Sequence, residues 1–369
     1  MTERPLRFVF IGLSITSAWG NGHATTYRSL IRGLSRCGHD VLFLEREVPW
    51  YAGNRDMAAP PFCQLSLYQD LAELKRRHEG DVRDADVVIV GSYVPEGVAV
   101  GDWVIRTARG VTAFYDIDTP VTLAKLAGGD FEYLAPALIS RYQLYLSFTG
   151  GPMLERIEQE YGAQRALPLY CSFDPDLYHP LPGTVADGQE PGWDLGYMGT
   201  WSDDRQPTLD RLLTKPARQW GGGRFVVAGP LYPDGMRWPP NVQRIDHVSP
   251  DRHPTFYCRQ RFTLNVTRSA MIAAGYSPSV RLFEAAACGT PIITDWWEGL
   301  DTVFRVGSEV LVPRSSRDVL DWLVDMPGTQ GREVGERARR RVLAEHTAVR
   351  RASQLEGYAR TALRMKPAA

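Results

Sequence analysis

The stretch Arg281-Leu-Phe-Glu-Ala-Ala-Ala-Cys-Gly-Thr-Pro-Ile-Ile-Thr-Asp295 joins a helix pattern directly to a buried strand pattern. Just upstream, Ser277 can cap the helix and Pro278 suits its first position, while Gly289 suits the residue after its end. We therefore predict about three turns of helix, followed by a short strand over residues 291–295. A helix that leads at once into an apolar strand is the repeating unit of a parallel α/β sheet.

The start of this predicted helix has the features of an anion site. A helix N-terminus that follows a glycine-containing loop presents free N–H groups and a positive dipole end, which together suit a diphosphate. Arg268 and Arg281 bracket the loop and could neutralise the phosphates, and Glu284 could accept hydrogen bonds from two ribose hydroxyls. The alternative is that Arg281 and Glu284 form only a surface pair at i, i+3 spacing, worth ~0.2–0.5 kcal/mol.

The same alternation of strand and helix patterns runs through both halves of the chain. Amphipathic or proline-started stretches predict helices over residues 23–36, 97–108 and 152–161. Residues 48–79 have a mixed composition and carry no clear pattern. Short apolar runs typical of strands in a parallel sheet occupy residues 6–12, 40–45, 86–91, 111–116, 144–149 and 167–171, and then 195–199, 224–229 and 262–267.

Two successive sets of strands and helices predict two domains, which is also the default for 369 residues. We predict an α/β fold of two doubly wound, Rossmann-like domains that face each other across a cleft. The first covers residues 1–171 and the second covers residues 193–348. Residues 172–192 are rich in Pro, Gly and Asp and are predicted to be the linker. Residues 349–369 are expected to form a C-terminal helix that packs back on the first domain.

Composition excludes several classes of function. The chain carries 42 Lys and Arg against 43 Asp and Glu, and its net charge of −1 gives no field that would recruit nucleic acid or an anionic membrane. No apolar run approaches the ~20 residues of a membrane span, and the N-terminus lacks the apolar segment of a signal peptide. The five cysteines are scattered and odd in number, which argues against a disulfide framework or a zinc site. We expect a cytoplasmic protein.

The stretch 281–295 resembles the donor-binding segment of retaining glycosyltransferases of the two-domain GT-B type. Among these the chain is most similar to the CgeB-like, or spore-maturation, group. The resemblance implies transfer of a sugar from a nucleoside diphosphate sugar to an acceptor hydroxyl with retention of configuration, and no cofactor or metal. It extends over residues 197–205, 228–233, 240–242, 264–268 and 275–279, and more weakly over residues 116–122.

The resemblance also assigns residues to the donor site. Gly199 would let the backbone approach the donor, Arg205 would bind phosphate, and Glu284 would hold the ribose. His247 and Val248 occupy the place where related enzymes hold the nucleobase. A plain turn with Arg205 in solvent, and a structural role for His247, are the alternatives. The complete set of donor-site candidates is Gly199, Thr200, Trp201, Arg205, His247, Val248, Arg268, Tyr276, Ser277, Ser279, Val280, Arg281 and Glu284.

Two loops of the first domain follow predicted strands, at the sheet edge where ligands of such folds bind. The loop Trp19-Gly-Asn-Gly-His23 offers His23 for contact with the sugar or the acceptor, or serves only as a turn. Asp116 and Asp118 form either a D-x-D metal motif or a carboxylate site beside the reacting sugar, able to orient or deprotonate the acceptor hydroxyl. A simple Asx-turn before Pro120 is a further alternative. We favour the carboxylate site, so the candidate catalytic residues are Asp116, Asp118 and His23, without a metal.

One position departs from the family pattern. Retaining enzymes usually have a glutamate eight residues before the ribose-binding one, near the transferred sugar, and here that position is Tyr276. This departure supports an alternative in which the protein binds a nucleotide sugar without reacting, as a partner subunit. A sugar-nucleotide epimerase or a phosphorylase of the same architecture is the other alternative.

Overall fold

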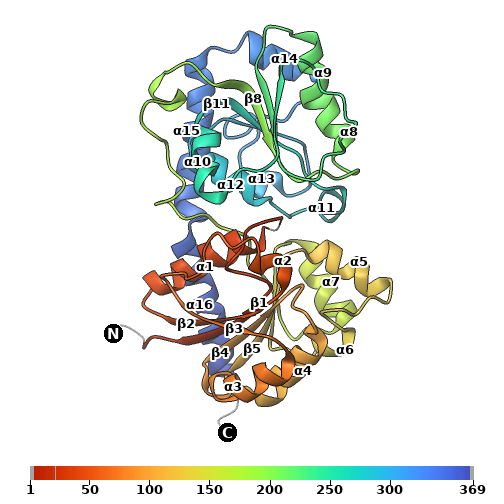
Figure 1. Ribbon diagram of the computed structural model, residues 1–369, viewed down its shortest axis with the longest axis vertical. Helices are drawn as coiled ribbons and strands as arrows, with labels where there is room; N and C mark the ends of the chain where they lie inside the picture. The colour runs from red at the N-terminus through yellow and green to blue at the C-terminus, as the bar shows by residue number, and fades with distance from the viewer. Residues whose placement is uncertain (1–3, 21, 366–369) are drawn as a thin grey trace. The chain divides into compact units, whose positions relative to one another are not determined.

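The computed structural model describes residues 4–20 and 22–365. The chain divides into two compact units, the first made of Met1–Cys171 with Ala348–Ala369 and the second of Ser172–Thr347 (Figure 1). Each unit is built on one parallel sheet whose strands are connected by helices. The predicted α/β class of two doubly wound, Rossmann-like units is confirmed.

The sheet of the first unit has the strand order β3-β2-β1-β4-β5-β6-β7, and all of its strand pairs are parallel. The order reverses between β1 and β4, so the loops that follow these strands diverge there. The elements are β1 Arg7–Gly12, α1 His23–Arg36, β2 Asp40–Arg46, α2 Pro49–Ala52, β3 Gln64–Tyr68, α3 Leu71–Asp84, β4 Val87–Gly91, α4 Gly97–Thr107, β5 Val111–Asp116, α5 Thr119–Ala127, α6 Pro136–Ile139, β6 Leu144–Ser147, α7 Pro152–Tyr161, β7 Ala166–Pro168 and α16 Ala348–Met365.

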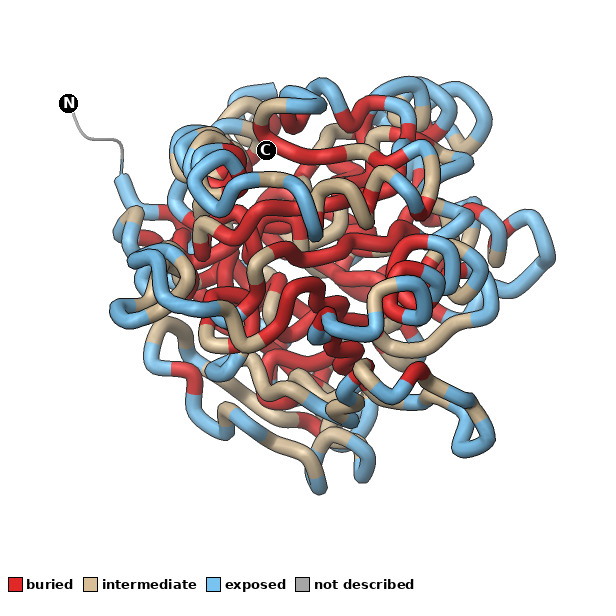
Figure 2. The backbone as a smooth tube through the Cα atoms, turned by 90° about the horizontal axis from the view of Figure 1, so that it is seen from above, coloured by how far each residue is buried: buried red, intermediate tan, exposed pale blue. Residues whose placement is uncertain are grey.

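Alternate residues of each strand enter the two cores of this unit, because successive side chains of a strand point to opposite faces. On β1, Phe8 and Phe10 join the core beneath α1 and α16, whereas Val9 and Ile11 join the core beneath α3, α4 and α7. The strand residues are therefore mostly buried, and in Figure 2 the buried segments, drawn red, lie inside an outer layer of exposed, pale blue segments.

The C-terminal helix α16 belongs to the first unit. Its Ala352, Leu355 and Ala359 are buried in the same core as the residues of α1. Gly33 of α1 permits this approach, because a Cβ atom there would lie 2.3 Å from the carbonyl oxygen of Ala348. The chain thus leaves the first unit after Cys171 and returns to it at Ala348.

The sheet of the second unit has the order β10-β9-β8-β11-β12, again with parallel pairs throughout. Its order reverses between β8 and β11. The elements are the 3-10 turn η1 Val185–Asp187, β8 Trp193–Met198, α8 Gln206–Leu209, the π-helical turn η2 Asp210–Thr214, α9 Lys215–Gln219, β9 Phe225–Ala228, β10 Val242–Ile245, η3 Pro250–Arg252, α10 His253–Cys258, β11 Gln260–Asn265, α11 Ser269–Ala274, α12 Val280–Ala287, β12 Ile292–Thr294, α13 Leu300–Val303, α14 Ser316–Val324 and α15 Gly328–Glu345.

The helix predicted from Pro278 begins two residues later than expected. α12 starts at Val280, with Ser279 rather than Ser277 as its N-cap. The delay has a backbone cause, because Tyr276 adopts a φ of 47° and its N–H donates to the Glu298 carbonyl over 2.6 Å. That bond holds the chain against the segment after β12 and keeps it from entering the helix sooner.

Residues 172–192, predicted to be a linker, are instead part of the second unit. Phe173 pairs with Thr347 in a short parallel bridge, and Tyr178 is buried and reaches α12. The sequence did not indicate that this stretch belongs to the second unit, because it packs through single side chains such as Tyr178 and has no periodic apolar pattern. Among the helices that the structure describes, none is long and apolar enough to cross a membrane.

Candidate functional site

The carboxyl edge of the second sheet gathers the predicted donor-site residues. Because all five strands are parallel, the loops after β8, β10 and β11 leave from the same edge. Residues 199–205 follow β8, residues 247–248 follow β10, and Arg268 follows β11. The helix α12 connects α11 to β12, so its N-terminus also starts from this edge. Residues widely separated in the chain are thus brought to one edge of the sheet, and those that follow β8 and β11 lie at its strand-order reversal.

Three arginines at this edge form no ion pair in the described part of the chain, although the Asp204 carboxylate lies within electrostatic range of Arg268. Arg205 is buried and donates to the carbonyl oxygen of Thr200 and, over 3.3 Å, to Ser202 Oγ. Arg281 donates to Ser279 Oγ over 3.3 Å. Within the described ranges neither these two nor Arg268 forms an ion pair, so the alternative pair between Arg281 and Glu284 is not formed. Uncompensated positive charges at a helix start favour an anionic ligand.

The arginines also affect one another. Burial lowers the pKa of Arg205, and the positive charges of Arg281 and Arg268 lower it further. Three mutually repelling guanidinium groups destabilise the protein unless an anion is bound between them. A polyanionic group such as a diphosphate would relieve this repulsion on binding, so the cluster favours the binding of such a group.

Two aspartates fix the loops that carry these arginines. Asp204 accepts from the Ser269 N–H over 2.8 Å and so ties the loop after β8 to the residue that follows Arg268. Asp295, at the end of β12, accepts from the N–H and the hydroxyl of Thr267 over 2.9 and 2.7 Å. Burial raises the pKa of Asp295. These bonds hold the loops before any ligand arrives, which lowers the entropy cost of binding.

Glu284 lies in a polar cluster that the sequence did not reveal. Its side chain is buried and accepts from the Tyr178 hydroxyl over 2.8 Å and the Tyr257 hydroxyl over 3.3 Å. The Nδ1 atom of His253 lies 3.7 Å from Glu284 Oε2. A carboxylate can accept about four hydrogen bonds, so two ribose hydroxyls remain within its capacity.

His253 links this carboxylate to the predicted nucleobase loop. Its Nε2 atom is 3.2 Å from the carbonyl oxygen of Val248, whereas its Nδ1 atom is 3.2 Å from the Tyr178 hydroxyl. The neighbouring His247 is exposed. His247 was predicted to contact the nucleobase, and that prediction stands untested. His253 was not among the sequence candidates, because only the fold shows which histidine lies beside Glu284.

The remaining donor-site candidates lie after β8 or at the start of α12. The Gly199 N–H donates to the Ala228 carbonyl over 2.8 Å, and the Trp201 N–H donates to the Pro230 carbonyl over 3.0 Å. A Cβ atom on Gly229 would lie 2.1 Å from the Gly199 carbonyl oxygen, so this crossing requires glycine. Thr200, Ser277, Ser279 and Val280 complete the set, and Tyr276 packs its ring on Gly299.

The first unit has a second cluster at its own strand-order reversal. His23 begins α1 after β1, and its Nε2 atom lies 3.9 Å from Asp118 Oδ2, which follows β5. The ring of Tyr93, which follows β4, meets the His23 ring edge-on at a centroid distance of 5.2 Å. The His23 Nδ1 atom is buried and has no hydrogen-bond partner among the described residues. A buried ring nitrogen of this kind can form a hydrogen bond with a ligand or with a water molecule.

Tyr93 is held in a strained backbone conformation, with a φ of 63°. A non-glycine residue in this region costs ~1–3 kcal/mol and persists where the surroundings require it. Its ring also lies against that of Tyr133, at a centroid distance of 4.7 Å and a tilted interplanar angle of 36°. The surroundings therefore hold Tyr93 in this conformation, and its ring stays packed against His23.

Asp116 is placed differently from Asp118. It is fully buried and accepts from the Tyr145 hydroxyl, the Thr122 hydroxyl and the Asp118 N–H over 2.5, 2.7 and 3.2 Å. Burial raises its pKa to about 6. Asp116 therefore supports the turn between β5 and α5, and Asp118 is the aspartate that remains accessible. No group of three or more metal-ligating side chains occurs in residues 4–20 and 22–365.

The pKa of Asp116 gives a stability prediction. Its folded value of about 6 lies above the ordinary 3.8, so the folded protein binds more protons between these values and loses stability as pH rises through them. Asp116→Asn should remove a loss on the order of 2 kcal/mol, because the amide retains an acceptor for Thr122 and Asp118. Urea unfolding of both proteins near pH 4 and near pH 7 measures this. Equal pH slopes for both would contradict it.

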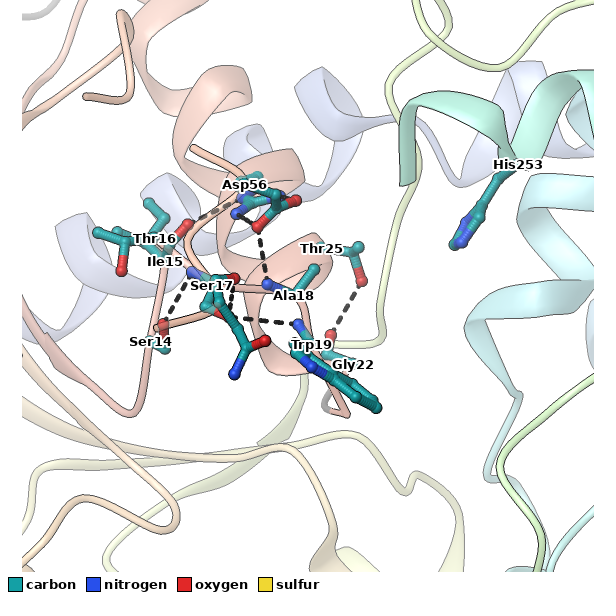
Figure 3. A network of polar contacts seen from close by, with 12 residues as sticks. Ser14, Ile15, Thr16, Ser17, Ala18, Trp19, Gly22, Thr25, Asp56 and His253 are labelled. Carbon is teal, nitrogen blue, oxygen red and sulfur yellow. Dashed lines mark hydrogen bonds and ion pairs between the residues drawn. The ribbon is translucent and has the colours of Figure 1, made fainter. Parts of the chain in front are cut away.

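The loop after β1 is held by an extensive polar network (Figure 3). Arg28 of α1 forms a two-bond ion pair with Asp56 at 2.8 Å and donates to the Ile15 carbonyl, while Asp56 accepts from the Ala18 N–H. The predicted loop from Trp19 to His23 begins directly after the residues of this network. Asn21 of that loop lies outside the described residues.

Comparison with known proteins agrees with this arrangement. Residues 205–357 match the protein family described as glycosyl transferase-like. No curated protein sequence matches the chain significantly.

Solved structures share the whole fold at low sequence identity. HepE of Anabaena, solved with UDP and glucose, is 12% identical with a TM-score of 0.69, covering 96% of this chain and 100% of its own. Sucrose-phosphate synthase of Thermosynechococcus elongatus is 15% identical with a TM-score of 0.69, covering 98% and 100%. An α-glucosyltransferase solved with UDP-glucose and DNA is 14% identical with a TM-score of 0.69, covering 97% and 100%. These likenesses establish a GT-B type of fold.

Proposed function

We propose that this protein is a glycosyltransferase that moves a sugar from a nucleoside diphosphate sugar to an acceptor hydroxyl. The observation that carries the proposal is the cluster of Arg205, Arg268 and Arg281, which form no ion pair in the described chain and lie at the strand-order reversal of the second sheet. The cluster is within or beside the segment that matches the glycosyl transferase-like family. UDP and UDP-glucose, present in similar folds, are the first ligands to test.

Each part of the cluster has a chemical role in this proposal. The arginines neutralise the two phosphates and stabilise the negative charge that develops on the leaving nucleoside diphosphate, the part that a divalent cation plays in metal-dependent enzymes. Glu284 binds the ribose, and the loop of His247 and Val248 binds the base. In the first unit, His23 with Asp118 orients or deprotonates the acceptor hydroxyl.

The finer assignments rest on resemblance. Retention of configuration and membership of the CgeB-like group are supported by the likeness of residues 281–295 and 197–205 to those enzymes. The net charge of −1 argues against a nucleic-acid acceptor, and we propose a cytoplasmic location. A non-catalytic binding subunit would need the arginine cluster but not the arrangement of His23, Tyr93 and Asp118.

A screen of nucleotides followed by a transfer assay tests the proposal. Thermal unfolding with UDP, GDP, TDP and the corresponding sugar nucleotides should show a rise in Tm for at least one of them. The donor so found is then incubated with saccharide acceptors, and NMR identifies the anomer formed. We expect transfer to continue in EDTA. Failure of every nucleoside diphosphate to raise the Tm overturns the donor site, and an isomerised sugar nucleotide without acceptor would indicate an epimerase.

A further inference from the structure

A pair of tryptophans lies at the carboxyl edge of the first sheet. Trp19 follows β1, and Trp50 lies on the short helix α2 that follows β2. Their rings are 5.8 Å apart with an interplanar angle of 38°, and Trp50 is 59% exposed. Trp19 is partly buried, so the two rings together present an aromatic surface at this edge, and exposed apolar surfaces often mark binding sites.

The segments that carry the two rings are joined to each other. The Ser17 hydroxyl donates to the Asn54 carbonyl over 2.7 Å, and the Asp56 N–H donates to the Thr16 carbonyl over 3.2 Å. The Asn54 side chain donates to the Trp50 carbonyl over 2.8 Å. The relative position of the rings is therefore fixed by the protein before a ligand binds.

A buried carboxylate reinforces this rigidity. Glu45 at the end of β2 is 0% exposed and accepts four hydrogen bonds from the loop after β1, two from backbone N–H groups and two from hydroxyls. Burying a charge is costly even when it is satisfied. This one serves to hold the loop residues 14–16, which is what a preformed binding surface needs.

We propose that Trp19 and Trp50 bind a pyranose ring of the acceptor, so that the acceptor is a saccharide. The C–H face of a pyranose carries slight positive charge and packs on the negative face of an aromatic ring. Arg55 and Glu47, an ion pair at 2.5 Å with each side chain about a fifth exposed, lie in the same segment and offer partners for sugar hydroxyls. A lipid chain has no polar groups that could form hydrogen bonds with this ion pair.

The position in the chain agrees with this assignment. The loop that carries Trp19 leads into α1 at His23, the residue that we propose acts on the acceptor hydroxyl. The statement that the bound saccharide is the acceptor rests on the proposed function. Binding of a saccharide by the tryptophans, in contrast, can be measured without any donor.

Saturation-transfer NMR with methyl pyranosides and common disaccharides, added to the full chain without nucleotide, tests the inference. We expect at least one saccharide to bind, with affinity reduced about tenfold in Trp50→Ala, the size of an aromatic contact. Trp50→Phe should recover part of the affinity. Phe131→Ala, which removes another exposed aromatic ring of the same unit, should bind as the wild type does. Because Trp50 is exposed, its replacement should leave the fold intact.

Several results would overturn the inference. One is equal saccharide binding by wild type and Trp50→Ala, and another is no saccharide binding at all. Shielding of Trp50 fluorescence by phosphatidylcholine vesicles, or by self-association at high protein concentration, without saccharide binding would assign the pair to a membrane or to a second copy. The rise in Tm with UDP is a separate measurement of the donor site. A failure of saccharide binding therefore does not contradict the donor site, and a failure of UDP to raise the Tm does not contradict saccharide binding by the tryptophans.

Discussion

Arg281→Met is expected to make the free protein slightly more stable and to remove most of its affinity for a nucleoside diphosphate. The two effects have one cause. Arg281 contributes to a cluster with Arg205 and Arg268, none of which forms an ion pair in the described part of the chain. Methionine keeps most of the apolar length of the side chain and removes the repulsion. Relief of about 0.5 kcal/mol, the size of an exposed charge pair, is expected.

The loss of affinity should be much larger than the gain in stability. A hydrogen bond to a charged group contributes ~1.5–3 kcal/mol, which corresponds to roughly 10- to 150-fold in Kd. Thermal unfolding without ligand and isothermal titration with UDP measure the two quantities on the same samples. Sugar transfer should fall at least as far as UDP affinity, because the arginine also stabilises the leaving diphosphate.

Arg340→Met provides the matched control. Arg340 is an exposed arginine on α15 of the same unit. Its loss changes the net charge by the same amount without touching the cluster. We expect wild-type UDP affinity for this variant. If both variants lost affinity equally, or Arg281→Met kept it, the anion site would have to lie elsewhere.

The donor side could be located from the sequence because it is a local pattern. A glycine loop, a helix start, two arginines and a glutamate occur within residues 268–284, and a parallel sheet brings its loops to one edge. The partners of Glu284 could not be found in this way. Tyr178 is separated from it by more than a hundred residues and lies in a stretch without periodicity, so only the fold joins them.

The sequence also left several elements of the first unit unpredicted, among them α2, α5 and α6, and for α3 and β3 the physical reason is related. The helix α3 buries only Leu74, His78 and Val82, a stripe of one residue per turn that is too narrow to stand out from its charged neighbours. The strand β3 lies at the sheet edge and is mostly only partly buried, so its apolar alternation is weak. Neither element contributes a candidate site residue, so the prediction of the site did not depend on them.

The pair Asp116 and Asp118 shows what spacing leaves undecided. The sequence places both at the end of a strand, and either could face a ligand. In the structure, three donors surround Asp116 in the interior, whereas the Asp118 side chain is 28% exposed and near His23. Burial distinguishes a supporting carboxylate from one available for chemistry, and it depends on Tyr145 and Thr122, which the motif does not contain.

His23→Ala is expected to lower kcat for sugar transfer by about 10²- to 10⁴-fold, the range for loss of a general acid or base. The Nδ1 atom of His23 is buried without a hydrogen-bond partner in the described chain. Asp118 Oδ2 lies 3.9 Å from the other ring nitrogen, and the Tyr93 ring packs edge-on against the His23 ring. UDP affinity should not change, because the arginine cluster is untouched. Steady-state kinetics and UDP titration of the same variant separate the two effects.

Added imidazole distinguishes a chemical role of His23 from a structural one. If the ring transfers a proton, imidazole that enters the space left in His23→Ala should restore part of kcat, whereas a loss of packing alone would not respond in this way. His78→Ala is the control, since His78 is also a buried histidine beside a carboxylate, Asp81 at 2.9 Å, but lies on α3. Its folded fraction should transfer sugar normally. Wild-type kcat in His23→Ala would exclude His23 from the reaction and move attention to Asp118.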